Sequence, residues 1–151
     1  MITNNEKNIT TVLHLSALTQ YIIPFGNYIF PIIIWSSKKD ESEYIDNNGK
    51  KVLNFQLSIF LYSMVLCMIA IPIFIYSIFK NIPFDAVITS ESFVLDNLSI
   101  SNITGLTILG IVALLLFCFL KITEFILIIL AAVKASNGEK YNYPLSIPFF
   151  K

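Results

Sequence analysis

The fold is decided by residues 52–79, VLNFQLSIFLYSMVLCMIAIPIFIYSIF, in which no side chain carries a formal charge. A helix needs about 20 apolar residues to cross the hydrocarbon core of a bilayer, so this run is long enough to do so. Two further stretches are similar: residues 12–35, which also lack charge, and residues 105–133, which are apolar apart from a few positions. The sequence therefore predicts an all-α integral membrane protein with three transmembrane helices.

The composition argues against a water-soluble domain. Of the 151 residues, 56% are hydrophobic and only 13% are charged, and the mean hydropathy is +0.73. A soluble domain carries roughly 25% charged residues, which it needs to cover its surface. The net charge is zero and every basic residue is a lysine, so the chain has no positive field that would recruit nucleic acid. We expect membrane lipids around the protein and no nucleic acid partner.

The predicted spans form a single membrane domain that covers residues 1–151. The third span is either one long helix or, alternatively, two short re-entrant halves. The three spans alternate with a first connection, an outer loop and a tail. In chain order these six segments are residues 12–35, 36–51, 52–79, 80–104, 105–133 and 134–151.

The distribution of lysine predicts the orientation. The connection at 36–51 holds four lysines and the tail at 134–151 holds three, whereas the loop at 80–104 holds only Lys80. Lysine is enriched in short cytoplasmic segments of membrane proteins. The connection and the C-terminus are therefore predicted to be cytoplasmic, and an odd number of spans places the N-terminus outside. We expect a multi-pass protein of the bacterial plasma (inner) membrane.

The first span contains Pro24, which predicts a kink because proline lacks a backbone N–H and clashes with the preceding turn. Gln20 and Asn27 fall on one face of this helix at helical spacing. Two interpretations stay open. The two side chains form a polar seam along a solute path, or they hydrogen-bond to neighbouring helices, as polar residues in membrane helices commonly do.

Four more polar residues lie within or beside the other spans. Asn54 and Gln56 stand two apart at the start of the second span, so they occupy different faces and at least one points into the bundle. Lys121 and Glu124 lie one turn apart in the third span. A lone charge there costs roughly 2.5 to 3.5 kcal/mol on insertion scales, which predicts that the two side chains pair. The pair is either structural or functional.

The sequence predicts no catalytic residue, no cofactor and no metal site. His14 is the single histidine and has no second ligand at metal-binding spacing, so we expect it to make a hydrogen bond. Cys67 and Cys118 lie in apolar runs and are too few for a disulfide framework. The spans contain no Asp and no H-E-x-x-H or G-x-S-x-G motif. We therefore expect that the protein is not an enzyme.

Short motifs recur at both ends of the chain. They include His14-Leu15-Ser16-Ala17-Leu18, Ile23-Pro24-Phe25-Gly26-Asn27, Leu53-Asn54-Phe55-Gln56, Asn137-Gly138-Glu139 and Tyr143-Pro144-Leu145. In order and number they resemble a family of small bacterial membrane proteins of unknown function. That family is distantly related to the roughly twenty-kilodalton core component of the chloroplast inner-envelope protein translocon. The resemblance implies a translocon-like protein and supplies no binding or catalytic residue.

Two functions from different classes remain. The first is a non-enzymatic subunit or assembly factor of a membrane complex, which the resemblance would link to protein translocation or insertion. The second is a small oligomeric channel or carrier that uses the polar seam. The expected partners are other membrane proteins or further copies of this chain.

A docking face is predicted on the cytoplasmic side from Lys50, Lys51, Tyr141 and Tyr143. These residues belong to the densest family-like motifs but lie outside the hydrocarbon, where packing between spans does not explain them. The structural alternative is that the tail and the first connection pack on each other and seal the inner ends of the helices.

Overall fold

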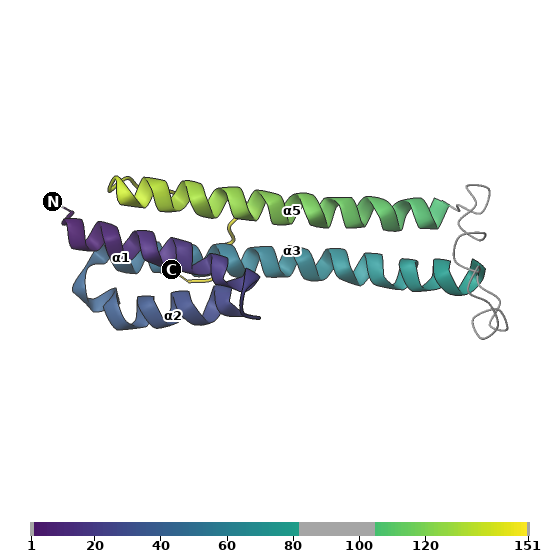
Figure 1. Ribbon diagram of the computed structural model, residues 1–151, viewed down its shortest axis with the longest axis horizontal. Coiled ribbons are helices and arrows are strands. Elements are labelled where there is room, and N and C mark those ends of the chain that lie inside the picture. The colour runs from purple at the N-terminus through teal and green to yellow at the C-terminus, as the bar shows by residue number, and fades with distance from the viewer. Residues whose placement is uncertain (1, 82–104, 151) are drawn as a thin grey trace. The chain divides into compact units, whose positions relative to one another are not determined.

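The computed structural model describes residues 2–81 and 105–150, with side chains described at 2–76 and 108–150. Every regular element in these ranges is helical, which confirms the all-α prediction there (Figure 1). The predicted outer loop lies outside the described residues from position 82 onward. In chain order the elements are α1 (Asn4–Leu15), the 3-10 helix η1 (Ser16–Tyr21), α2 (Gly26–Lys38), the 3-10 helix η2 (Lys39–Glu41), α3 (Glu43–Asn81) and α5 (Gly105–Ser136).

Within the described ranges, two helices are long and apolar enough to cross a membrane, namely Glu43–Tyr76 within α3 and Ile108–Ser136 within α5. Large apolar side chains along them are exposed, for example Met68 at 64% and Phe119 at 68%. Exposed apolar surface of this extent marks a surface for lipid or for a partner, whereas the core helix of a soluble protein would bury it. The third predicted span is one continuous helix, so the alternative of two re-entrant halves is wrong.

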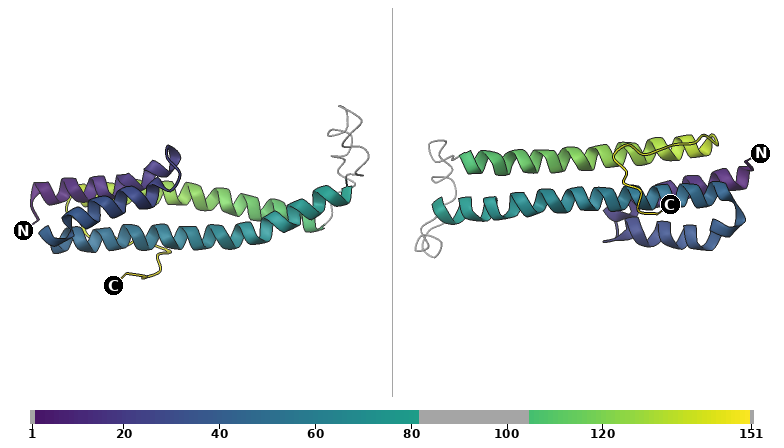
Figure 2. Two further views of the ribbon diagram at one scale, coloured as in Figure 1. Left: turned by 90° about the horizontal axis from the view of Figure 1, so that it is seen from below. Right: turned by 180° about the vertical axis from the view of Figure 1, so that it is seen from behind.

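The prediction that residues 12–35 form one kinked crossing is wrong. This stretch contains the end of α1, all of η1 and most of α2, and the chain reverses direction between η1 and α2. Figures 1 and 2 show α1 and α2 side by side and antiparallel. We call this pair the hairpin. With 12 and 13 residues, its two α-helices are each shorter than the roughly 20 residues that a crossing requires.

The reversal has a local cause. Pro24 cannot donate a backbone hydrogen bond, and Phe25 adopts the left-handed conformation with a φ of 61°. Gly26 then packs directly on Thr19, where an added Cβ would lie 2.6 Å from the Thr19 hydroxyl oxygen. The turn is hard to recognise because its residues are apolar, and Ile22 is 83% exposed. A hydropathy pattern therefore passes through the turn without interruption.

The N-terminus lies at the same end of the fold as the connection between α2 and α3 and the end of α5. The Ser42 side chain hydrogen-bonds to Glu6, and the Lys7 side chain lies against Gly138. The Tyr44 hydroxyl donates to the carbonyl oxygens of Ala135 and Glu139. The hairpin thus returns the chain to the end of unit 1 where it began, whereas the sequence prediction places the N-terminus and the connection on opposite sides of a membrane.

The predicted connection at 36–51 is largely helical. Helix α2 continues to Lys38 and α3 begins at Glu43, so Gly49 lies inside a helix rather than in a turn. Its role is steric: an added Cβ would lie 2.1 Å from Cδ1 of Trp35. Trp35 also donates through Nε1 to Oδ1 of Asp46, at 2.9 Å. Glycine thus lets the indole of α2 lie directly on the backbone of α3.

The chain divides into two compact units, of which unit 1 comprises residues 1–62 and 120–151 and unit 2 comprises residues 63–119. In unit 1, Leu13, Phe55 and Ile128 are fully buried and bring α1, α3 and α5 into one core. In unit 2, α5 packs on α3 at Gly110. A Cβ added at this glycine would lie 3.2 Å from Cγ2 of Ile73. The polar residues singled out from the sequence all belong to unit 1, so that unit holds the candidate site.

Candidate functional site

The predicted Lys121–Glu124 pair exists and has a third member. Lys121 Nζ lies 2.8 Å from Oε2 of Glu124, and Gln20 Nε2 donates to Oε1 of the same carboxylate at 2.9 Å. The Glu124 side chain is fully buried, while that of Lys121 is one third exposed. Both carboxylate oxygens therefore have a donor inside the protein, one from α5 itself and one from η1.

Asn27 and Gln56 are partners of each other. Asn27 Nδ2 donates to Oε1 of Gln56 at 2.8 Å, which joins the start of α2 to α3. The Tyr28 hydroxyl adds a bond to the main-chain oxygen of Gln56 at 3.2 Å. The second amide nitrogen of Gln56, Nε2, is buried and has no partner among the described residues. Gln20 and Asn27 thus hold the hairpin to α5 and α3, as the inter-helix interpretation of the seam expects.

His14 is buried in a cluster that unites three segments. Tyr143 of the tail places its hydroxyl 2.8 Å from Nδ1 of His14, and Asn48 Oδ1 lies 3.2 Å from Nε2. Asn48 Nδ2 donates to the Tyr44 carbonyl, which orients the amide so that its oxygen accepts from His14. The Tyr143 ring stacks on Phe55 with centroids 4.1 Å apart. His14 serves as a hydrogen-bonded core residue here.

The tail is fastened along α3 by three polar residues spaced one turn apart. Asn54 Oδ1 accepts from the backbone N–H groups of Phe149 and Phe150, and its Nδ2 donates to the Phe150 carbonyl. The Ser58 hydroxyl oxygen accepts from Ile147 N, at 2.7 Å. The third bond runs from the Tyr62 hydroxyl to the Leu145 carbonyl, at 3.1 Å. Side chains at i, i+4 and i+8 share one helix face, so they match an extended segment that runs antiparallel to the helix.

This ladder, formed by Asn54, Ser58 and Tyr62, contains two residues that sequence reasoning missed. The signal was present, since three hydrogen-bonding side chains recur every fourth position in a largely apolar stretch of α3. Their partners are backbone groups of the tail, which a side-chain pattern does not reveal. Asn54 and Gln56 are both buried, and they face different partners as their spacing requires.

The four residues of the predicted docking face have different surroundings. Tyr143 is only 6% exposed and Tyr141 is half-buried against it, with the two rings edge to face. Lys50 pairs with Asp46 at 2.7 Å. Lys51 lines a surface hollow together with Lys140. The tyrosines therefore favour the structural alternative, in which the tail seals the bundle, and Lys51 is the residue whose surroundings suggest binding.

Residues 5–150 match the MamF/MmsF family, described as the magnetosome magnetite crystal formation protein family. The chain belongs to this family. It is thus a membrane protein of a bacterial family, in agreement with the exposed apolar helices α3 and α5. The relation to the chloroplast translocon component finds no support in this match. No curated protein and no solved structure matches the chain.

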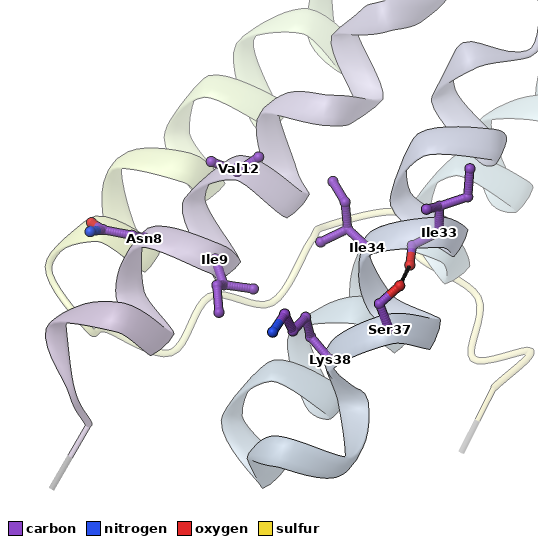
Figure 3. Close-up of a pocket in the computed structure, with 7 residues that line it drawn as sticks. All are labelled: Asn8, Ile9, Val12, Ile33, Ile34, Ser37 and Lys38. Atoms are coloured by element: carbon purple, nitrogen blue, oxygen red, sulfur yellow. Dashed lines mark hydrogen bonds between the residues drawn. The ribbon is translucent and has the colours of Figure 1, made fainter.

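This family member has a groove between the two helices of the hairpin, with a volume of about 390 Å³. Figure 3 shows Ile9 of α1 and Ile34 of α2 facing each other across it. The rest of the lining is Asn8 and Val12 of α1 with Ile33, Ser37 and Lys38 of α2. Lys38 is already paired with Glu41 at 2.6 Å. The groove is therefore lined mainly by apolar side chains, and its one charged side chain, Lys38, already has an ion-pair partner.

The described parts of the chain also contain no group of three His, Cys, Asp or Glu side chains that could hold a metal ion. The carboxylate at the centre of the site, Glu124, is instead satisfied by an ammonium and an amide. The arrangement thus cross-links α1, η1, α2, α3, α5 and the tail by polar contacts.

We expect Asn54→Ala to release the tail, because three hydrogen bonds to backbone groups disappear together. Each such bond contributes about 1 kcal/mol, and the stranded backbone groups add to the loss. Limited chymotrypsin digestion in detergent, which can cut after Phe149 and Phe150, should become at least several-fold faster. Asn47→Ala, an asparagine of the same helix outside the ladder, is the control. Equal rates of digestion for Asn54→Ala and Asn47→Ala would contradict the conclusion that Asn54 holds the tail on α3.

Acid is expected to destabilise the protein through His14. Burial lowers the pKa of His14 to about 4 from an ordinary value of 6.5; the Asn48 hydrogen bond opposes this shift and the Lys51 charge adds to it. The unfolded chain then binds a proton between pH 6.5 and 4 that the folded chain does not. Stability is full above pH 6.5 and falls with pH, by about 3 kcal/mol in total.

The measurement is the free energy of unfolding in detergent at several pH values between 7 and 4. His14→Gln should be less stable at pH 7 but should lose the dependence on pH in this window. Glu6, whose pKa is lowered to about 2 chiefly by the Ser42 hydrogen bond, loses its contribution at lower pH, between 4.5 and 2. If His14→Gln retains the slope between pH 6.5 and 4.5, another group is responsible.

Proposed function

We propose that this protein is a non-enzymatic component of a membrane complex, which joins other membrane proteins or further copies of itself. The observation that carries the proposal is that buried polar side chains from different elements bond to one another, as in the Gln20–Glu124 and Asn27–Gln56 bonds. Side chains used in this way are not free to hold a substrate or to transfer protons in a reaction. They give a rigid scaffold that can present its surface to partners.

The proposal is tested with the full-length protein in its native membrane. Crosslinking followed by mild-detergent purification should recover defined partners or a defined homo-oligomer. Recovery of the monomer alone, at crosslinker doses that capture a known complex, would contradict the proposal. An oligomeric channel or carrier is the alternative. Reconstituted vesicles should show no solute flux above that of empty vesicles, and flux that Gln20→Leu abolishes would favour the alternative.

We further propose a topology of two crossings, by α3 and α5, with both termini in the cytoplasm of a bacterial cell. The lysine distribution supports a cytoplasmic location of this end of the fold, because lysine is enriched in short cytoplasmic segments. Lys7 adds to the lysines of the connection and the tail, since it lies at the same end. Single cysteines at Asn4 and Ser136, in a background without Cys67 and Cys118, should resist an impermeant thiol reagent in intact cells. A cysteine at Ser90 should react, and labelling of Asn4 would refute the topology.

The family description extends the proposal to one process. The complex would belong to the membrane around a growing magnetite crystal, and the support is the match over residues 5–150. The translocation role implied by the resemblance is not part of the proposed function. In a cell that forms magnetite, deletion of this protein should change the size or number of crystals seen by electron microscopy. Unchanged crystals would remove this role and leave the complex to be identified by crosslinking.

A further inference from the structure

A surface hollow of about 350 Å³ lies at the end of unit 1 where α3 begins. Its wall is one face of α3, completed by a residue before α1 and a residue of the tail. The lining residues are Ile2, Glu43, Tyr44, Asn47, Asn48, Lys51 and Lys140. The positions on α3 follow the i, i+4, i+8 spacing of one helix face. Three segments distant in the sequence thus build one concave, largely polar surface.

Two ammonium groups share this hollow without a carboxylate partner. Neither Lys51 nor Lys140 forms an ion pair with any described residue, and their charges are close enough to repel each other. Two neighbouring carboxylates are engaged elsewhere, since Asp46 pairs with Lys50 and Glu139 pairs with Lys134, and Glu43 lines the hollow without an ion pair to either lysine. Two like charges held together on one surface are unfavourable unless an anion lies between them.

The hollow also lies at the depth of lipid headgroups. Lys51 is the last charged residue before the uncharged run at 52–79, so it marks the boundary between water and hydrocarbon. Lysines at this boundary are attracted to anionic lipids. Their ammonium groups and the side-chain amide of Asn47 supply hydrogen-bond donors that suit phosphate oxygens.

We propose that this hollow binds the phosphate group of an anionic membrane phospholipid between Lys51 and Lys140. Glu43, the remaining carboxylate in the lining, opposes the bound anion and limits the affinity. Tyr44 and Asn48 of the lining also take part in the His14 cluster, whereas the two lysines do not. The inference rests on the proposed crossing by α3 and is independent of the proposed complex.

The test uses the full-length protein in mild detergent, titrated with phosphatidylglycerol or phosphatidylcholine and observed by native mass spectrometry. The wild type should bind one phosphatidylglycerol in preference to phosphatidylcholine. Lys51→Gln and Lys140→Gln should each weaken that binding about tenfold, because each removes a charge-assisted hydrogen bond. Glu43→Gln should strengthen it. Lys38→Gln removes the same charge from another exposed lysine and should leave the affinity unchanged.

Lys140 lies in the exposed part of the tail, so Lys140→Gln should fold even if Lys51→Gln does not. An equal loss in Lys38→Gln would show attraction to overall charge and overturn the site. Unchanged binding in Lys140→Gln, or weaker binding in Glu43→Gln, would do the same. A third titration uses inorganic phosphate. If inorganic phosphate displaces phosphatidylglycerol at a similar concentration, the hollow binds phosphate rather than a lipid. The proposal of a phospholipid site is then overturned.

Discussion

Replacing Gly49 by alanine is expected to lower the free energy of unfolding by about 3 kcal/mol, because the new methyl group overlaps the Trp35 ring. The added Cβ would lie 2.1 Å from Cδ1 and 2.5 Å from Cγ of the indole. The ring cannot yield cheaply, since it also bonds to Asp46 and packs edge to face against Phe150. The sign is informative, because alanine in place of glycine inside a helix ordinarily stabilises it by up to about 1 kcal/mol.

Tryptophan fluorescence measures this effect directly, because Trp35 is the single tryptophan in the chain. Gly49→Ala should shift the emission and lower the midpoint of unfolding together. The matched control is Gly110→Ala in α5, where the nearest atom is a methyl group of Ile73 at 3.2 Å, which can move. Adding Trp35→Leu to Gly49→Ala should recover part of the loss. If Gly49→Ala is as stable as the wild type, the close approach of α2 and α3 is wrong.

The two long apolar helices could be predicted from the sequence because hydropathy and length determine them. Their apolar runs are long enough for the hydrocarbon core, and their exposed apolar side chains mark a surface for lipid or for a partner. The pairing of Lys121 with Glu124 followed from the cost of an isolated charge. These features depend on local composition, and the structure agrees with them.

The hairpin could not be predicted in this way. A turn in water is polar, whereas the turn from Ile22 to Gly26 contains no polar side chain. Hydropathy therefore does not distinguish a helix that continues from one that reverses. Pro24 is compatible with a kink in one crossing as well as with a reversal, and the length of the run favours the crossing. The same interpretation separates the N-terminus from the connection, whereas the structure places both at one end of unit 1.

The surroundings of the candidate site depended on contacts between distant segments. The pairing of Asn27 with Gln56 requires the reversal of the hairpin, and Tyr143 reaches His14 only because the ladder on α3 holds the tail in place. Spacing within one helix identified which side chains share a face. It did not identify which segment covers that face.

The second large effect is expected at Glu124, whose fully buried carboxylate depends on Lys121 for its charge balance. Lys121→Met leaves this carboxylate with only the amide of Gln20 as a donor. Removing one partner of a buried pair costs about 3 to 5 kcal/mol, because the remaining charge is stranded. Glu124→Leu should also be destabilising, since it leaves the ammonium of Lys121 unpaired about 20 Å from Lys134 along the helix.

The double variant, Lys121→Met with Glu124→Leu, should be more stable than either single variant, because no unpaired charge remains. The free energy of unfolding of the four proteins in detergent gives the coupling directly. Gln20→Leu is added as a fifth protein, since it removes the amide donor without removing a charge and should cost about 1 to 2 kcal/mol. If the losses of stability in the two single variants simply add in the double variant, the 2.8 Å contact between Lys121 and Glu124 contributes no coupling energy. In that case Glu124 would have to be neutralised in another way, and its burial by η1 and α5 would need a different explanation.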